Sequence, residues 1–558
     1  MHVPKQLLGF ALAGALASVA SIAYSLQTRQ PAVPSCADSR DIRLTNGKFY
    51  TLNRQNTTVA EVTIQNGRFD AVGPIGNRSV NPCTKVVDVG GRTVIPGIVD
   101  NHNHIVLLGL RPGHDTRLET AGSIADVQAI IKSRAAGVPA GEFITAMGGW
   151  NSSQFAEKRL PTLAELDAAA PNHPVIVYQG FTGPAATNTK AMAFFTAKNI
   201  AVSPAGAIAA NAPSVAALDA LRSVQTFEDK KRGTMDAMAY SASVGVTTNV
   251  DMGAFVIPGL PDIQDSFVFN GLASQDPFHM YDAFAELHHQ GKFSTRLRIF
   301  FLTMDTQPTV PLLNQRLLNM FRDYGDDMMR ASGIGEFATN WAVGGAPPAQ
   351  ATYTAALSLI AKQGWAFQQH SLSAAEDELT VSTFETVNAV TPIAELRWSI
   401  AHAPRIDAVK LNRLKAMGAG IAVHPFQYLN AMGGGPPLRT IMDSGIHVGA
   451  GSDSAQISTL DPWLMIYYMV TGKNASGVVV NAGQQLTRME AIRLYTVENG
   501  WFLHEENRLG SMEPGKLGDL VVLSEDYFDT AKVSDEGIKK IKSVYTVVDG
   551  KAVYDRLH

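Results

Sequence analysis

Short apolar segments alternate with longer amphipathic stretches through the middle of the chain. Eight of the apolar segments have the length and composition of buried strands, and mostly helical sequence separates them. This alternation is typical of a parallel α/β architecture, and eight units predict a closed, TIM-like (β/α)₈ barrel. The expected barrel strands are 95–104, 245–252, 297–303, 333–338, 366–370, 398–402, 420–424 and 447–453.

Both ends of the chain show shorter segments of strand composition instead. These segments are 43–51, 59–72, 85–95, 519–523 and 543–554. Asn66-Gly67 and Asp549-Gly550 are hairpin turn signals within them. We therefore expect a small β-sandwich domain built from 41–94 plus 513–558, around a barrel domain spanning 95–512.

A long insertion, about 106–240, separates the first two expected barrel strands and contains strand-like pieces of its own at 143–147 and 175–178. Loops at the carboxyl ends of barrel strands surround the active site. The insertion is therefore expected to form a lid or a specificity wall.

The first 26 residues form a separate segment. His2 and Lys5 precede an apolar stretch rich in Ala, Gly and Ser, which resembles a secretory signal peptide. Its length approaches that of a membrane span, so an uncleaved anchor is the alternative. Residues 27–40 are polar, and this composition predicts a linker. We expect an exported protein, secreted or periplasmic, with membrane contact only through an uncleaved segment.

Cysteine usage agrees with export. Cys36 and Cys83 are the two cysteines of the chain, and both lie in its N-terminal region. In an oxidising compartment they could form one disulfide; two unpaired thiols are the alternative.

Composition narrows the class of partner. The 558 residues carry a net charge of −4 without a dense basic stretch, which argues against nucleic acid and anionic membrane surfaces. We therefore expect a small-molecule substrate as the partner. The sequence leaves open whether the chain forms a homo-oligomer.

Candidate metal ligands occur repeatedly at the ends of the expected strands. Alternate residues of a strand face the same side, so His102 and His104 can reach one ion. Catalytic groups of such barrels gather at the carboxyl ends of the strands. The candidate residues at these ends are His102, His104, Asp251, Glu336, His370, His402, His424 and Asp453.

These motifs resemble the amidohydrolase superfamily, and more narrowly the amidohydrolase 3 group, which includes N-substituted formamide deformylase-like proteins. The resemblance covers nearly the whole mature chain. It is carried by Pro96-Gly-Ile-Val-Asp-Asn-His-Asn-His104, by Ser399-Ile-Ala-His402 and by Gly449-Ala-Gly-Ser-Asp453. The C-terminal stretch from Leu509 to Leu523 resembles a highly specific signature of the family.

The resemblance implies a role for each matching residue. His102 and His104 would bind the more buried metal, His370 and His402 the second, and Asp453 would contact the attacking water. The ion is a divalent metal, with Zn²⁺ favoured by histidine-rich ligation.

Two positions depart from the family pattern. The family often has a carboxylated lysine on the fourth strand, where this chain has Glu336. A glutamate can bridge two metals without modification, or one ion could be bound mainly by Glu336, His370 and His402. The insertion has Thr182-Gly-Pro where the family commonly has Gly-His, which removes one expected substrate contact.

Three further residues are candidates for the substrate pocket. Trp150 and Phe155 follow a Gly-Gly turn where relatives place a pocket aromatic; packing within the insertion is the alternative. His424 could bind substrate or stabilise an oxyanion, or have a structural role.

The expected activity is hydrolysis of a carbon–nitrogen bond in a non-peptide amide, formamide or related compound, by hydroxide generated at the metal. Asp453 would act as general base and then as acid. The scaffold also supports ester hydrolysis, deamination and decarboxylation, and a secreted binding protein with a degenerate site is an alternative of another class.

Overall fold

The computed structural model describes residues 36–74, 76, 81–256, 271–340, 348–429, 434–454 and 456–557. The chain divides into two units, Met1–Asp38 and Ser39–His558. The expected signal peptide or anchor lies outside the described residues, as does most of the expected linker. Within the described ranges, no helix is both long and apolar enough to cross a membrane. Cys36 and Cys83 are both disulfide-bonded, which confirms the expected disulfide.

Eight parallel strands form the barrel sheet, in the order β22-β21-β20-β19-β18-β17-β14-β8. The sheet is nearly closed, because the backbone N–H of Asp453, just past β22, donates to the carbonyl of His102 in β8 (2.9 Å). The predicted barrel is thus confirmed. Its strands are β8 (Ile98–Asn103), β14 (Val246–Asp251), β17 (Arg296–Phe301), β18 (Met329–Glu336), β19 (Ala366–Ser371), β20 (Ser399–His402), β21 (Gly420–Val423) and β22 (His447–Ala450).

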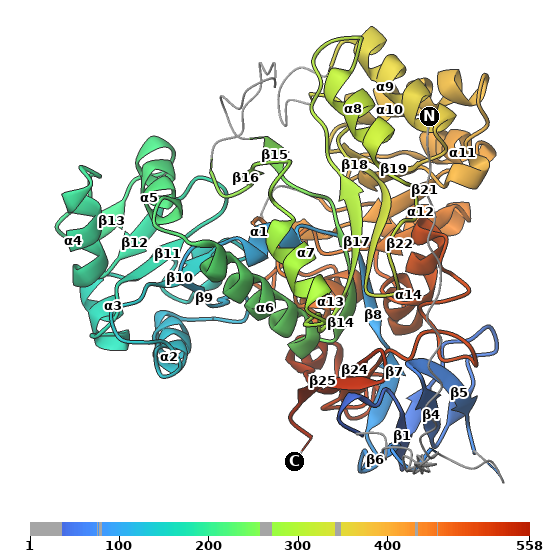
Figure 1. Cartoon of the computed structure of the whole chain (residues 1–558), viewed down its shortest axis with the longest axis horizontal. Helices are drawn as coiled ribbons and strands as arrows, with labels where there is room; N and C mark the ends of the chain where they lie inside the picture. Colours follow the sequence, from blue (N-terminus) through green and yellow to red (C-terminus); the bar gives the residue numbers. More distant parts are fainter. Residues whose placement is uncertain are drawn as a thin grey trace, which may run out of the picture. The chain divides into compact units, whose positions relative to one another are not determined.

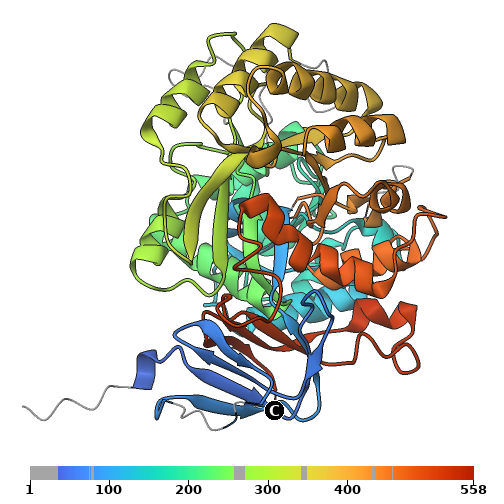
Figure 2. The same cartoon turned by 90° about the vertical axis from the view of Figure 1, so that its right-hand side faces the viewer.

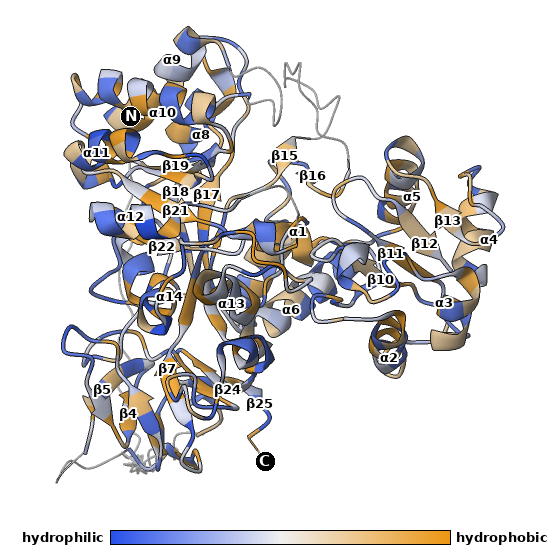
Figure 3. Cartoon of the chain, turned by 180° about the vertical axis from the view of Figure 1, so that it is seen from behind, coloured by the Kyte–Doolittle hydropathy of each residue, from blue (hydrophilic) through white to orange (hydrophobic). Residues whose placement is uncertain are grey.

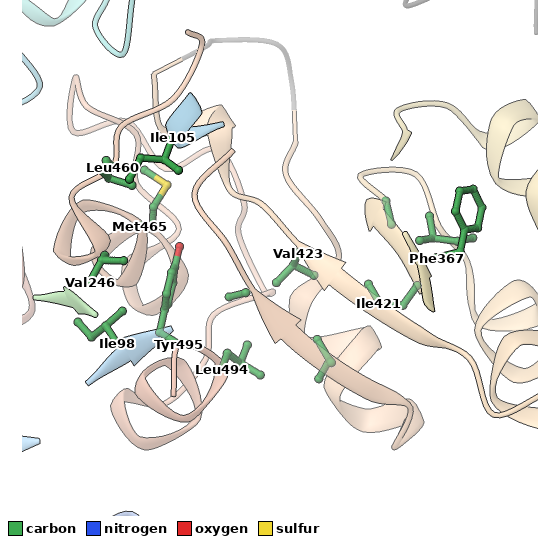
Figure 4. Packing of buried hydrophobic residues seen from close by; sticks show 14 of the residues in the cluster. Ile98, Ile105, Val246, Phe367, Ile421, Val423, Leu460, Met465, Leu494 and Tyr495 are labelled. Atoms are coloured by element: carbon green, nitrogen blue, oxygen red, sulfur yellow. The ribbon is translucent and has the colours of Figure 1, made fainter. Parts of the chain in front are cut away.

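Helices surround this sheet (Figure 1). Figure 3 shows apolar residues concentrated on the barrel strands, and Figure 4 shows Ile98, Val246 and Tyr495 packed within the core. Helix α10 shows how the helices begin: Ser373 and Glu376 form a capping box at its first turn. The helices are α6 (Phe227–Ser243), α7 (Asp282–His289), α8 (Pro311–Asn319), α9 (Gln350–Lys362), α10 (Ala374–Asn388), α11 (Ala408–Ala416), α12 (Leu438–Ser444), α13 (Pro462–Thr471) and α14 (Arg488–Leu494).

The expected first barrel strand, 95–104, is two strands rather than one. β7 (Thr93–Pro96) belongs to another sheet, and β8 begins after Gly97. A side chain at Gly97 would collide with Thr247, whose Oγ1 would lie 2.2 Å from its Cβ. The chain therefore passes between the two sheets at a point where only glycine fits.

Two further sheets combine the chain ends. A six-stranded sheet has the order β25-β24-β23-β7-β2-β3, and a four-stranded sheet has the order β5-β4-β1-β6. Leu44 and Ile64 of the smaller sheet share a core with Leu520 and Val547 of the larger one, which makes a β-sandwich. Blue and red strands lie side by side there in Figure 2. The strands are β1 (Ile42–Thr45), β2 (Lys48–Tyr50), β3 (Thr58–Val59), β4 (Val62–Gln65), β5 (Arg68–Val72), β6 (Lys85–Asp88), β23 (Leu520–Leu523), β24 (Ser543–Val548) and β25 (Lys551–Asp555).

The insertion folds around a sheet of its own, with the order β13-β12-β11-β10-β9 (Figure 1). It meets the loop that follows β22, because the backbone N–H of Gly149 donates to the carbonyl of Gln456 (2.8 Å). Its role as a lid stays a prediction. Its elements are β9 (His114–Asp115), β10 (Ile144–Met147), β11 (Val175–Tyr178), β12 (Ala185–Thr187), β13 (Ala207–Ile208), α2 (Ile124–Ala135), α3 (Leu163–Ala169), α4 (Thr189–Ala197) and α5 (Ala212–Arg222). The short helix α1 (Ile105–Gly109) leads into it, and β15 (Phe255–Val256) pairs with β16 (Ser274–Gln275) after β14.

Candidate metal centre

The six predicted metal ligands come together at the carboxyl ends of the barrel strands. All are buried, and each lies within a strand, at its last residue or just beyond it. They are His102 in β8, His104 after β8, Glu336 ending β18, His370 in β19, His402 ending β20 and Asp453 after β22.

The Glu336 carboxylate lies between two pairs of histidines. Its Oε2 is 2.7 Å from Nδ1 of His370 and 3.2 Å from Nε2 of His402. Its Oε1 is 3.4 Å from Nε2 of His104, and Nε2 of His102 is 3.7 Å from Oε2. One carboxylate thus faces both halves of the cluster, as a bridging ligand would.

Asp453 faces the same cluster from the other side. Its Oδ1 lies 3.6 Å from Nε2 of His102 and 3.4 Å from Nε2 of His104, and its Oδ2 lies 3.7 Å from Nδ1 of His402. The Asp453 carboxylate therefore faces both histidines of the first pair and one histidine of the second.

The donor set fits a divalent cation. His102, His104 and Asp453 can converge on one point, and Glu336, His370 and His402 on another, with the ligand atoms of each group within 4.8 Å of one another. Nε2 of His102 is buried without a hydrogen-bond partner in the described part of the chain, so it is available to a metal. Imidazole nitrogen and carboxylate oxygen are the ligands that zinc and related ions prefer.

Hydrogen bonds to the far ring nitrogens orient the first histidine pair. Nδ1 of His102 meets Oε1 of Gln368 (2.5 Å), and Nδ1 of His104 meets the carbonyl of Gly253 (2.7 Å). These contacts direct Nε2 of each ring into the cluster. Hydrogen-bond partners of metal-binding histidines commonly orient the ring in this way.

Asp100 holds the two ends of the barrel together next to the ligands. Its Oδ1 accepts from the backbone N–H of Ser452 (2.8 Å) and of His102 (3.3 Å), and its Oδ2 accepts from the Ser452 hydroxyl (2.5 Å). Sequence reasoning missed both Asp100 and Gln368; a polar residue inside an apolar strand was the available signal.

Asp251 ends β14 and supports His104 indirectly. It accepts from the Tyr281 hydroxyl (2.5 Å) and from the backbone N–H of Gly253 (3.0 Å), whose carbonyl contacts His104. Asp251, a candidate ligand from the sequence, therefore lies next to the metal-binding residues and supports His104.

The electrostatics of the cluster favour ionised carboxylates. Burial opposes the charge of Glu336, but His370 and hydrogen bonds with three histidines outweigh it and hold its pKa well below the usual range. Burial likewise opposes the charge of Asp453, yet the charge of His402 and the nearby rings of His102 and His104 lower its pKa. Burial, followed by the charge of His370, lowers the pKa of His402 to about 4, so its ring is neutral and able to donate a lone pair.

His424 follows β21 and lies within the histidine cluster. Its ring centroid is 4.1 Å from that of His102 and 4.6 Å from that of His402. Its Nδ1 lies 2.8 Å from Nδ1 of His402, and burial lowers its pKa well below the usual value. Oxyanion stabilisation or substrate binding by this residue stays a prediction.

Trp150 and Phe155 lie in the hydrophobic core of the insertion. Their rings stack with centroids 5.6 Å apart, and the indole N–H donates to the carbonyl of Ala146 (3.3 Å). This placement gives both rings a packing role; a contact with substrate stays a prediction.

Known proteins resemble this chain over most of its length. The model of the amidohydrolase family matches residues 85–554. N-substituted formamide deformylase of Arthrobacter pascens is 22% identical over 93% of this chain and 99% of its own. A metal-dependent hydrolase of Pyrococcus horikoshii shares the fold with a TM-score of 0.58 at 18% identity, covering 89% of this chain and 99% of its own. Atrazine chlorohydrolase of Arthrobacter aurescens, solved in complex with zinc, matches with a TM-score of 0.51 at 15% identity. The match covers 93% of this chain and 96% of the chlorohydrolase chain. Since the family model spans most of the chain, the protein is an enzyme of the amidohydrolase family.

Proposed function

We propose that this enzyme hydrolyses a carbon–nitrogen bond in a small non-peptide amide, formamide or related compound. The observation that carries the proposal is the Glu336 carboxylate between two histidine pairs, with Asp453 facing three of the same rings. The similarity to a formamide deformylase over nearly the full length of both chains supports the bond type.

The ligands divide into two groups. His102 and His104 would hold one divalent ion and His370 and His402 a second, with Glu336 shared between them. Zinc is the ion that this donor set favours. When bound, such an ion lowers the pKa of a coordinated water and polarises the carbonyl of the substrate.

Asp453 is the proposed proton carrier. Its carboxylate faces three of the histidine rings, so we place it as the acceptor of the proton of the attacking water. Returning that proton to the leaving nitrogen completes the cycle. The hydrogen bond between Asp453 N–H and the His102 carbonyl fixes the backbone from which this carboxylate projects.

The bridge is tested by metal quantification on purified protein and on the Glu336→Ala variant. We expect two equivalents in the parent and one or none in the variant. Glu395→Ala, which removes an exposed carboxylate, is the matched control and should keep two. Unchanged metal content in Glu336→Ala would remove this residue from the site.

The base is tested by Asp453→Asn with a panel of amides, formamides and esters. We expect turnover of the best amide to fall by about 10²–10⁴-fold, because general acid–base catalysis contributes that much. Full turnover by the variant would refute the assignment. A parent enzyme that hydrolyses only esters would refute the proposed bond type.

We also propose that the protein is exported. The disulfide state of both cysteines supports this proposal, because disulfides persist in oxidising compartments. Fractionation of expressing cells tests it, and a protein confined to the cytosol with reduced thiols would contradict it.

A further inference from the structure

A second cavity of about 380 Å³ lies apart from the metal ligands. Segments that are distant in sequence meet there: the insertion near Ala121, the turn at Tyr428, helix α13 and the chain around Lys540. Its volume falls in the range of small-molecule sites, which is roughly 300–1,000 Å³.

Part of the inner wall of this cavity is apolar and buried. Ala121, Leu464 and Tyr428 line it and expose 3%, 3% and 6% of their surface. Ala121 belongs to the hydrophobic core of the insertion, and Tyr428 and Leu464 belong to that of the barrel, so the wall is preformed and presents a small apolar area to the cavity.

The rim of the cavity is basic, because Lys539, Lys540 and Lys542 line it together. Lys539 is already engaged, with Nζ 3.4 Å from Glu536 and 4.8 Å from the centroid of the Tyr467 ring. Within the described ranges, neither Lys540 nor Lys542 has an ion-pair partner, and both side chains are exposed. Two ammonium groups are thus available to a ligand.

The acidic groups beside the cavity are satisfied by protein donors. Glu119 accepts from the Arg117 guanidinium (2.6 Å), from the Tyr240 hydroxyl (2.9 Å) and from the backbone N–H of Leu460 (3.1 Å). Asp461 is buried, caps α13 by accepting from a backbone N–H, and lies within range of the Lys542 charge. The charge left uncompensated at the mouth is therefore positive.

We propose that this cavity is a second ligand site, for a small organic anion. A carboxylate or phosphate group would meet Lys540 and Lys542, and an apolar body would contact Ala121, Tyr428 and Leu464. Opposite charge attracts the head group, and the buried wall selects against simple inorganic anions.

Calorimetric titration of the metal-loaded full chain tests the proposal, with hexanoate, hexyl phosphate, hexanamide and inorganic phosphate as probes. We expect saturable binding of hexanoate or hexyl phosphate that weakens with added salt, and much weaker binding of the other two. The tighter of the two amphiphiles identifies the head group. In Lys540→Ala/Lys542→Ala, its dissociation constant should rise roughly tenfold, since two exposed charge contacts are lost.

Lys132→Ala/Lys551→Ala is the matched control, because it removes two exposed lysines outside the cavity. It should bind the amphiphile like the parent. Equal affinity in the Lys540/Lys542 variant would overturn the proposal and assign the binding to the metal centre. Equal affinity for hexanamide would overturn the anionic ligand class. Neither result bears on the hydrolytic activity, so the two proposals fail separately.

Discussion

A buried ion pair fastens the barrel to the β-sandwich. Arg296 begins β17, and its Nε and Nη2 lie 2.7 and 2.8 Å from the two carboxylate oxygens of Asp519, which precedes β23. The two side chains expose 0% and 5% of their surface. Arg296→Met would leave the Asp519 carboxylate buried, with the backbone N–H of Asp549 as a remaining donor (3.0 Å).

Removing one partner of such a buried pair costs about 3–5 kcal/mol, because the other charge stays desolvated. Unfolding entropy is about 2.1 cal/mol/K per residue, or about 1.1 kcal/mol/K for the Ser39–His558 unit. The melting temperature of Arg296→Met should therefore fall by roughly 3–5 °C. Differential scanning calorimetry of the metal-loaded protein measures this shift.

Two further variants make the reasoning refutable. Arg413, which pairs with Glu378 and Glu385 at the surface, is the matched control; Arg413→Met should shift the melting temperature by less than about 1 °C. Arg296→Met/Asp519→Leu removes both charges and should recover most of the loss. A single variant as stable as the parent, or a double variant less stable than the single one, would contradict the account.

Two other predictions concern the metal site and its neighbourhood. Gln368→Leu removes the acceptor at Nδ1 of His102, so metal affinity should fall by about 10–100-fold in a chelator competition; an unchanged affinity would remove Gln368 from the support of the site. Burial raises the pKa of Asp461 to about 7, only partly countered by Lys542, so the folded state holds a proton that the unfolded state has released above about pH 4. Stability should then fall between about pH 4 and 7, by at most about 1.4 kcal/mol per pH unit. Asp461→Asn keeps the cap on α13 without titrating, so its stability relative to the parent should grow over this range and level off above it; a pH-independent difference in thermal unfolding would refute this.

The sequence predicted the barrel well because buried parallel strands are continuous apolar runs, and their polar ends mark the catalytic face. Local chemistry also predicted the hairpins: Asn66-Gly67 and Asp549-Gly550 all have positive φ, which such turns require. The candidate ligands could be named because they stand at the ends of five such runs, and His102 and His104 share the first.

Other features depend on contacts between distant segments. Asp100 acts through Ser452, which reaches it only once the barrel closes. Gln368 lies in β19 and contacts His102 in β8, although these two strands are not neighbours in the barrel sheet. The break at Gly97 lies between two short apolar stretches, and the Pro96-Gly97 pair was its local sign, which the apolar periodicity on both sides outweighed. Its cause is the close approach of Thr247 and Asp519.

The pairing of β7 with β23 has a consequence for synthesis of the chain. Pro96 in β7 is matched with Leu520 in β23, so one edge of β7 stays unpaired on the ribosome until almost the entire polypeptide has been made. An open apolar edge of this kind recruits other strands. Truncation before Leu520 should therefore yield aggregated chains rather than a shortened enzyme, and a chaperone that holds the nascent N-terminal strands would raise the yield of the full-length protein.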